Sequence, residues 1–184
     1  MRIFGAVLAG GRGQRMAGAD KALLPLAGRP LVAHVISRLE PQVERLALSA
    51  NGDAGRFASF GLPVLADGMS LGPLSGVLAA LDWAARLGAT AVVTVAVDTP
   101  FVPGDLVPRL CLAAEANPRG VAMAHSGTDD HPTCALWPMG LRDALAAFLA
   151  SGAKTRVRDF ADAHGAVRAE FPSDGAFFNV NTPQ

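Results

Sequence analysis

The sequence alternates between short apolar runs, rich in Val, Ile and Ala, and longer segments whose apolar residues recur at helical spacing. Ala91–Val97 constrains the fold most, because it reads Ala-Val-Val-Thr-Val-Ala-Val and is apolar on both faces. Such a strand is typical of the centre of a parallel sheet that is covered on both sides. The alternation of runs and helical segments therefore predicts an α/β fold with a mostly parallel central sheet and helices on both faces.

The same patterns predict the remaining elements. We expect strands at Ile3–Leu8, Leu46–Ser49, Val64–Ala66, Ala91–Val97, Val121–His125, Thr133–Trp137, Ala169–Phe171 and Phe177–Val180, with a polar turn over Ser126 to His131. We expect helices at Leu31–Leu39, Leu74–Leu87, Asp105–Ala116, Leu141–Leu149 and Val157–Ala163. The 184 residues contain no internal repeat, low-complexity tract or linker. We therefore predict a single domain over residues 1–184.

Composition narrows the classes of function. Lys plus Arg equals Asp plus Glu at 16 each, whereas a protein that holds long nucleic acids is usually basic. Cys111 and Cys134 lack metal-ligand spacing and are typical of reduced thiols. No apolar stretch approaches the ~18 residues of a membrane span, and Ile3–Ala9 runs into a glycine turn without the cleavage site of a signal peptide. We expect a cytoplasmic protein that binds neither nucleic acid nor membrane.

A glycine-rich loop follows the first predicted strand. It reads Leu8-Ala9-Gly10-Gly11-Arg12-Gly13-Gln14-Arg15-Met16 and is followed by Asp20-Lys21. Adjacent glycines let backbone N–H groups approach phosphate oxygens, and Arg15 and Lys21 supply positive charge. A solvated turn from strand to helix is the alternative. Neither the dinucleotide fingerprint nor the Walker A loop fits this string.

A carboxylate, Asp98, follows the central strand and is itself followed by Thr99-Pro100. Ligands of α/β sheets collect at the carboxyl ends of strands, where a carboxylate can bind Mg²⁺ beside a triphosphate. An Asp-Thr-Pro turn that caps the next helix is equally compatible with the spacing. The residues alone leave both interpretations open.

Several strings together resemble one family, the molybdenum cofactor guanylyltransferases. The loop from Leu8 to Lys21 resembles the triphosphate-binding loop of that superfamily, and Asp98 to Leu106 resembles its Asp-Thr-Pro-x-x-Pro-x-Asp-Leu string. Three further strings match: Gly72-Pro73-Leu74-Ser75-Gly76, His131-Pro132 with Leu136-Trp137, and Phe178-Asn179-Val180-Asn181-Thr182-Pro183. The chain departs from the family at Ala17, which is usually Gly, and at Gln184, beyond which the family continues with an acidic residue and a helix.

The resemblance implies a fold and an activity. The fold would be a three-layer α/β/α Rossmann-like nucleotidyltransferase domain. The activity would be a Mg²⁺-dependent guanylyltransferase that moves GMP from GTP to the terminal phosphate of Mo-molybdopterin and releases pyrophosphate.

The resemblance also assigns candidate roles to residues of this sequence. Catalysis falls to Arg15, Lys21 and Asp98, with Asp98 as the metal ligand. The nucleotide and its metal are assigned to Leu8, Ala9, Gly10, Gly11, Lys21, Asn51, Asp67 and Asp98. The pterin side is assigned to Gly76, Arg156, Asn179 and Asn181, with Lys154 nearby. Asn51 is equally compatible with a plain turn, and we interpret His131 as a turn residue without a catalytic role.

Three alternatives stay open beside this assignment. One is the cytidylyltransferase for the same pterin, which the strings at Gly72–Gly76, Asp98–Pro100 and Asn179–Pro183 disfavour. Another is a sugar-phosphate nucleotidyltransferase, although those chains usually run longer. The third is a non-catalytic nucleotide-binding protein, against which Asp98 argues. The resemblance further implies a monomer that meets the molybdenum-insertion enzyme and the chaperones of molybdoenzymes.

Overall fold

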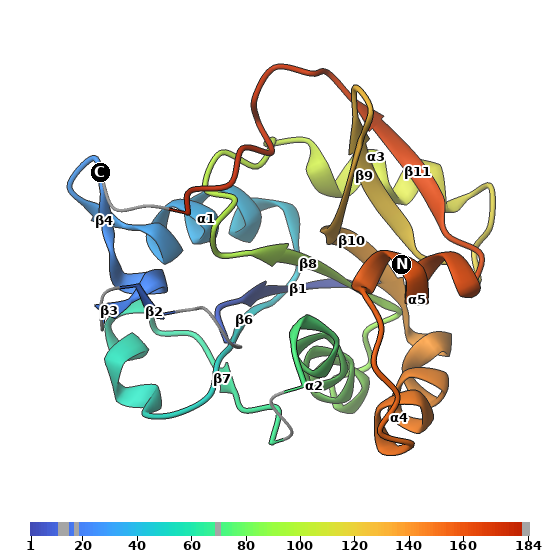
Figure 1. Ribbon diagram of the computed structural model, residues 1–184, viewed down its shortest axis with the longest axis horizontal. Helices are drawn as coiled ribbons and strands as arrows, with labels where there is room; N and C mark the ends of the chain where they lie inside the picture. The colour runs from blue at the N-terminus through green and yellow to red at the C-terminus, as the bar shows by residue number, and fades with distance from the viewer. Residues whose placement is uncertain (11–14, 17–18, 69–70, 182–184) are drawn as a thin grey trace.

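A seven-stranded sheet forms the centre of the computed structural model, which describes residues 1–10, 15–16, 19–68 and 71–181 (Figure 1). The strand order is β11-β9-β10-β8-β1-β6-β7. These strands are β1 (Ile3–Leu8), β6 (Leu46–Ser49), β7 (Val64–Leu65), β8 (Ala91–Ala96), β9 (Ala122–Ser126), β10 (Asp129–Pro138) and β11 (Val167–Phe171). Two small antiparallel pairs lie outside the sheet, β2 (Arg15–Met16) with β3 (Ala19–Asp20) and β4 (Pro25–Leu26) with β5 (Arg29–Pro30).

The sheet is mostly parallel, as the apolar runs predict. β1 pairs in parallel with β6 and β8, and β6 with β7, whereas β10 runs antiparallel to both β8 and β9. Leu8 lies opposite Ser49 on one side and Ala96 on the other, so β1, β6 and β8 end side by side. The residues that follow these strands therefore meet at one end of the sheet.

Helices cover both faces of the sheet, which confirms the three-layer α/β/α fold. The helices are α1 (Leu31–Leu39), α2 (Pro73–Arg86), α3 (Leu106–Ala114), α4 (Arg142–Ala150) and α5 (Val157–Ala163). Short 3₁₀ segments occupy Lys21–Leu23, Glu40–Gln42, Ala54–Phe60 and Met139–Leu141. Figure 1 shows α1 and α3 on one side of the sheet and α2 and α4 on the other.

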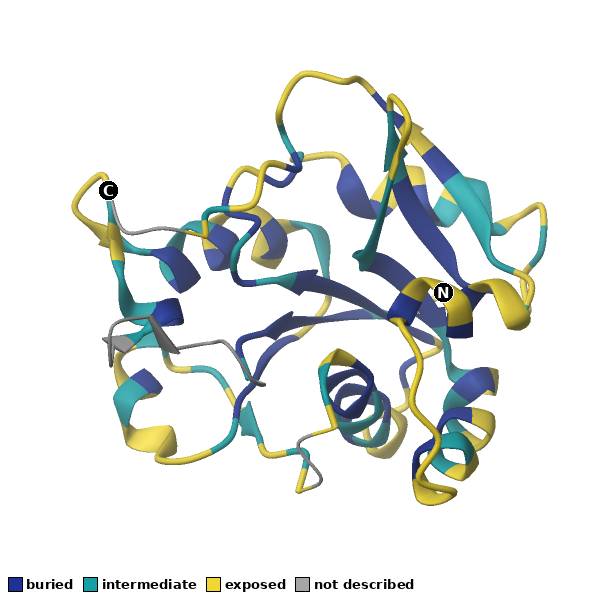
Figure 2. Cartoon of the chain, in the orientation of Figure 1, coloured by how far each residue is buried: buried dark blue, intermediate teal, exposed yellow. Residues whose placement is uncertain are grey.

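The hydrophobic core is divided in two by the sheet. Alternate residues of a strand point to opposite faces, so Val7 of β1 packs with α1 while Ala6 and Leu8 pack with α2. Thr94 is buried at the centre of the sheet, where its hydroxyl accepts a hydrogen bond of 3.0 Å from the Trp137 indole. Figure 2 shows the buried residues concentrated in the strands and on the inner sides of the helices. This rigid centre holds the strand ends in place.

Two predictions about local structure need correction. The turn predicted over Ser126 to His131 is present but shorter, because β9 and β10 pair up to Ser126 and Asp129 and leave only two residues between them. Phe177–Val180 is not a strand but an irregular segment, in which Phe178 N–H donates to Gly175 O at 3.1 Å.

The other predicted elements are present, most with ends that shift by one to three residues. Within the described residues, no helix is long and apolar enough to cross a membrane.

Candidate functional site

The candidate site lies at the end of the sheet where β1, β6, β7 and β8 finish. Backbone bonds continue the sheet slightly past the strands, from Ala9 N–H to Ser49 O at 2.8 Å and from Val97 N–H to Leu8 O at 3.1 Å. A Cβ on Gly10 would lie 3.2 Å from the Ala50 Cα, so the glycine permits the two strand ends to approach closely. Leu8, Ala9 and Gly10 therefore lie beside the residues that follow β6.

Lys21 is the centre of the site's polar contacts. Its Nζ donates to Asn181 Oδ1 at 2.9 Å and lies 3.3 Å from Asp98 Oδ2. The lysine side chain is 8 % exposed, and the carboxylate is 25 % exposed. A largely buried ammonium requires such partners because losing water costs it several kcal/mol. Three residues that are far apart in the sequence thus converge at one point.

The segment Asn179–Asn181 is bound to the residues that follow β8. Val180 N–H donates to the backbone carbonyl of Asp98 at 2.8 Å. Thr99 is buried, with 2 % of the residue exposed. Its hydroxyl lies 3.3 Å from Asn179 Oδ1 and 3.4 Å from Asp98 Oδ1. The two asparagines therefore lie beside the candidate metal ligand.

Asn51 and Asp67 form a reciprocal pair past the ends of β6 and β7. Asn51 Nδ2 donates to Asp67 Oδ1 at 2.9 Å, and the backbone N–H of Asp67 donates to Asn51 Oδ1 at 3.0 Å. The pair brings an amide and a carboxylate together at the end of the sheet that also carries Asp98. Such groups recognise the hydrogen-bonding edge of a nucleobase.

The first turns of α2 lie against the strand ends. Gly76 is buried, and a Cβ there would lie 2.9 Å from Ser49 Oγ and 3.2 Å from Leu8 Cδ2. Glycine is therefore what lets the helix pack this closely on β1 and β6. Ser75 Oγ accepts from Leu71 N–H at 2.9 Å and donates to Gly72 O at 2.8 Å, which fixes the turn before the helix.

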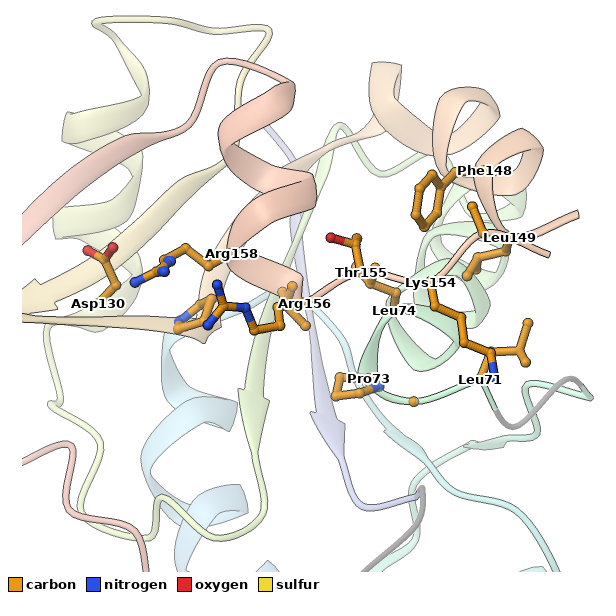
Figure 3. Close-up of a pocket in the computed structure, with 14 residues that line it drawn as sticks. Leu71, Pro73, Leu74, Asp130, Phe148, Leu149, Lys154, Thr155, Arg156 and Arg158 are labelled. Atoms are coloured by element: carbon orange, nitrogen blue, oxygen red, sulfur yellow. The ribbon is translucent and has the colours of Figure 1, made fainter. Parts of the chain in front are cut away.

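A cavity of about 610 Å³ opens beside the start of α2 (Figure 3). It is lined by Leu71, Gly72, Pro73, Leu74, Asp130, Pro132, Phe148, Leu149, Ala153, Lys154, Thr155, Arg156, Val157 and Arg158. Lys154 lies beside Leu71 and Leu149 on the apolar side of the cavity. Arg156, which precedes α5, and Arg158, which lies within it, are nearer to Asp130. Arg156 is bound to Asp159 at 3.1 Å but remains largely exposed. The cavity is thus suited to a ligand with an apolar or planar body and an anionic group.

Among the described residues that line the cavity, Asp130 is the one carboxylate, and it already forms an ion pair. Asp130 receives bonds from Arg168 and from the His125 imidazole. The Arg168 guanidinium, with His125, lowers the pKa of Asp130 to about 2. The same carboxylate raises the pKa of His125.

His131 lies within β10, not in a turn as predicted. Its ring stacks on Phe177 with centroids 4.4 Å apart, and its Nε2 lies 2.7 Å from Ser126 Oγ. Burial lowers the pKa of His131, so the neutral ring is favoured in this packing. These contacts give His131 a role in packing β10 against the segment that carries Phe177.

Asp98 fits a metal that arrives with phosphate groups. Among the described residues, no cluster of three or more His, Cys, Asp or Glu side chains could hold a metal ion by itself. Mg²⁺ is commonly bound through one or two carboxylates together with substrate phosphates and water. The carboxylate of Asp98 is compatible with that mode of binding.

Two of the predicted site groups cannot be placed. Gly11 lies outside the described residues, and Arg15 is described only as part of the backbone of β2.

Asp20, Arg56 and Thr99 are functional-site residues to which the sequence motifs assign no role. Arg56 Nε and Asp20 Oδ2 are 2.6 Å apart, although the two residues are 36 positions apart in the sequence. One local signal was available, because Asp20 precedes a short helical turn and has the side chain of an N-cap. Nothing local in the sequence identifies the partner of Arg56.

Comparison with known proteins identifies the family to which this chain belongs. The model of the MobA-like NTP transferase domain matches residues 5–167. The chain therefore belongs to the MobA-like NTP transferase family, whose class is that of the nucleotidyltransferases.

Relatives within that family are named molybdenum cofactor guanylyltransferase. The protein of Cereibacter sphaeroides is 59 % identical over 100 % of this chain and 93 % of its own length. The protein of Mesorhizobium japonicum is 52 % identical over 98 % of this chain and 91 % of its own length. Both identities, over nearly full length, confirm the resemblance in the sequence motifs.

A solved structure supports the fold independently. The molybdopterin-guanine dinucleotide biosynthesis protein A of Archaeoglobus fulgidus superposes with a TM-score of 0.73, covering 98 % of this chain and 93 % of that one. The two sequences are 22 % identical, so this likeness concerns the fold alone.

Proposed function

We propose that this chain transfers GMP from GTP to the terminal phosphate of Mo-molybdopterin, giving the guanine dinucleotide form of the cofactor and pyrophosphate. The observation that carries the proposal is the convergence of Lys21, Asp98 and Asn181 at the strand ends. This convergence occurs in a chain whose near-full-length relatives are named for that activity.

The nucleotide would lie along the first loop and the ends of β6 and β7. Backbone groups from Leu8 to Gly11 would face the phosphates, with positive charge from Arg15 and Lys21. Asn51 and Asp67 would hold the guanine, since their amide and carboxylate can meet both donors and acceptors of its edge.

Asp98 would hold Mg²⁺. A metal held there would supply positive charge that offsets the charge on the leaving pyrophosphate. Lys21 already contacts the same carboxylate, so its ammonium is within reach of the same phosphate charge. Thr99 and the backbone bond from Val180 keep Asp98 in place.

The chain's own residues would act by alignment and charge neutralisation. The attacking group is a phosphate monoester, which is already anionic near neutral pH, so no strong general base is needed. Fixed positive groups that face developing negative charge, and the correct alignment of the two substrates, supply most of the acceleration in such transfers.

The pterin would occupy the cavity beside α2. Its apolar wall suits a planar ring, and Arg156 with Lys154 suits an anionic group. Gly76 brings α2 against the strand ends, while Asn179 and Asn181 would meet the pterin phosphate where it approaches the nucleotide.

We further propose that residues 1–184 act as one domain, as a cytoplasmic monomer. Its substrates are small molecules, and neither nucleic acid nor membrane is involved. The molybdenum-insertion enzyme and the chaperones of molybdoenzymes would be its protein partners.

The direct test supplies purified protein with molybdenum-loaded pterin, Mg²⁺ and either GTP or CTP, and identifies the product by mass. A guanine dinucleotide formed from GTP alone is the expected result. A cytosine dinucleotide would replace the proposed base with the alternative one. If the protein binds a nucleotide but forms no product with either, the proposed activity is wrong.

A further inference from the structure

We propose that Arg56 is a positioning residue that couples the base side of the nucleotide site to its phosphate side. The inference rests on the proposed function, because it assigns Asn51 to the base and Lys21 to the phosphates. It adds a residue that neither the sequence motifs nor the names of the relatives assign. Its basis is a continuous set of contacts that runs between the two sides of the site.

One arm of Arg56 reaches the loop that carries Lys21. Its Nε donates to Asp20 Oδ2 at 2.6 Å. The other carboxylate oxygen of Asp20 accepts from Ala22 N–H at 3.1 Å and so caps the short helical turn that begins at Lys21. Arg56 therefore fixes the residue that sets the direction of the Lys21 turn.

The other arm reaches the loop that carries Asn51. The Nη2 of Arg56 donates to the carbonyl oxygen of Asn51 at 2.8 Å, and Nη1 donates to the carbonyl oxygen of Asp53. Asn51 in turn is bound to Asp67. Arg56 thus holds the backbone of the residue whose side chain would contact the base.

The guanidinium itself is held in one orientation. Its Cζ lies 4.4 Å from the centre of the Phe57 ring, which is fully buried. The side chains of Arg56 and Asp20 are 24 % and 21 % exposed, so water screens this pair only in part. A planar group with five donors can serve both loops at once, whereas a lysine ammonium acts as a single point.

The arrangement has a functional consequence. Binding of the base fixes the Asn51 loop, and through Arg56 it also fixes the turn that positions Lys21 toward the phosphates. This coupling follows because the one guanidinium is hydrogen-bonded to both loops. Removing the tie should therefore weaken GTP binding and also lower kcat, since misalignment near the reacting phosphate slows transfer.

The test compares Arg56→Met with a matched control, Arg142→Met. Arg142 forms an ion pair with Asp82 of the same length, 2.6 Å, between α4 and α2, away from the strand ends. We expect Arg56→Met to bind GTP about tenfold more weakly and to lose about tenfold in kcat. The control should match the wild type in both. Calorimetric Kd values for GTP, kcat, KM and melting temperatures are measured for all variants.

A double-mutant cycle separates positioning from general destabilisation. Asn51 is bonded to Asp67, whereas Lys21 is bonded to Asp98 and Asn181. If Arg56 links the two loops, the effect of Asn51→Ala on kcat should depend on Arg56. We expect this effect to be several-fold in the wild type and to disappear in the Arg56→Met background. Equal effects in the two backgrounds would overturn the proposal.

Arg56→Lys keeps the proposal testable if Arg56→Met fails to fold. The lysine retains a positive charge beside Asp20 but cannot also reach the Asn51 carbonyl. We expect its GTP affinity to remain below that of the wild type and the Asn51 effect on kcat to be absent. Wild-type values for both would contradict the role of Arg56. A wild-type protein that binds no GTP would instead overturn the proposed function.

Discussion

At the scale of single residues, the ion pair of Lys21 with Asp98 is the contact on which the proposed activity depends most. The lysine is held by Asp98 and Asn181, so the positive charge is already in place before a substrate binds. The backbone carbonyl of Asp98 also anchors Val180. The side chain and the backbone of this aspartate therefore have separable roles.

We predict that Asp98→Ala lowers the transfer rate by at least about 100-fold, because it removes the proposed metal ligand and an electrostatic partner of Lys21. The fold should persist, since the bond from Val180 to the Asp98 carbonyl does not use the side chain. The rate is measured by the mass assay and the fold by circular dichroism. Asp105→Ala, which removes an exposed pair with Arg109, is the control and should remain active.

We also predict a stability change below neutral pH that depends on His131. Burial lowers the pKa of His131, so the unfolded chain binds its proton more readily, and stability falls as the pH drops below about 6.5. The raised pKa of His125 acts in the opposite direction. Urea unfolding at pH 7 and pH 5 should show a smaller loss in His131→Gln than in the wild type. Equal losses would contradict this account.

The site residues differ in how far the sequence predicts them. Lys21, Asp98 and Asn181 lie in recognisable strings, and the structure brings them together. Arg56 and Thr99 depend on partners supplied by tertiary packing, at Asp20 and Asn179. No local pattern specifies such a partner. For this reason the motifs predict the strand ends but not the residues that hold them in position.

At the scale of elements, the apolar runs predict the buried strands well and the polar strands poorly. Ile3–Leu8 and Leu46–Ser49 were predicted with the observed bounds, because burial on both faces leaves a clear pattern. β10 starts at Asp129, earlier than expected, because its polar first residues pair with β9 at the open end of the sheet. A hydrophobic pattern does not reveal such a strand, because its polar side chains hydrogen-bond to one another across β9 and β10.

A tight contact between two turns gives a prediction at this scale. A Cβ on Gly120 would overlap the Gly165 carbonyl oxygen, where the turn before β9 meets the turn after α5. Backbone cannot move aside as a side chain does, so Gly120→Ala should lower the free energy of unfolding by about 2 kcal/mol.

The control for that variant is Gly140→Ala, since no atom lies within 4 Å of a Cβ there. Its free energy of unfolding should stay within about 0.5 kcal/mol of the wild type, as at most exposed positions. Urea titration of both variants tests the comparison. Similar losses in the two would show that the contact between the turns is not the cause.

At the scale of the whole molecule, the sheet joins two cores that share every central strand. We expect one cooperative unfolding transition, with the same midpoint by fluorescence and by circular dichroism. GTP with Mg²⁺ at 100 times its Kd should raise the free energy of unfolding by about 2.7 kcal/mol. Two separate transitions would contradict the proposal of one domain.

The contact between Lys21 and Asn181 joins positions that are 160 residues apart in the sequence. Chains emerge from the ribosome with their N-terminal part first, so the glycine-rich loop is made long before Asn181 is available to it. During synthesis the lysine lacks its contact with Asn181. A nascent chain is thus expected to hold nucleotide poorly until Asn181 has been translated and can reach Lys21.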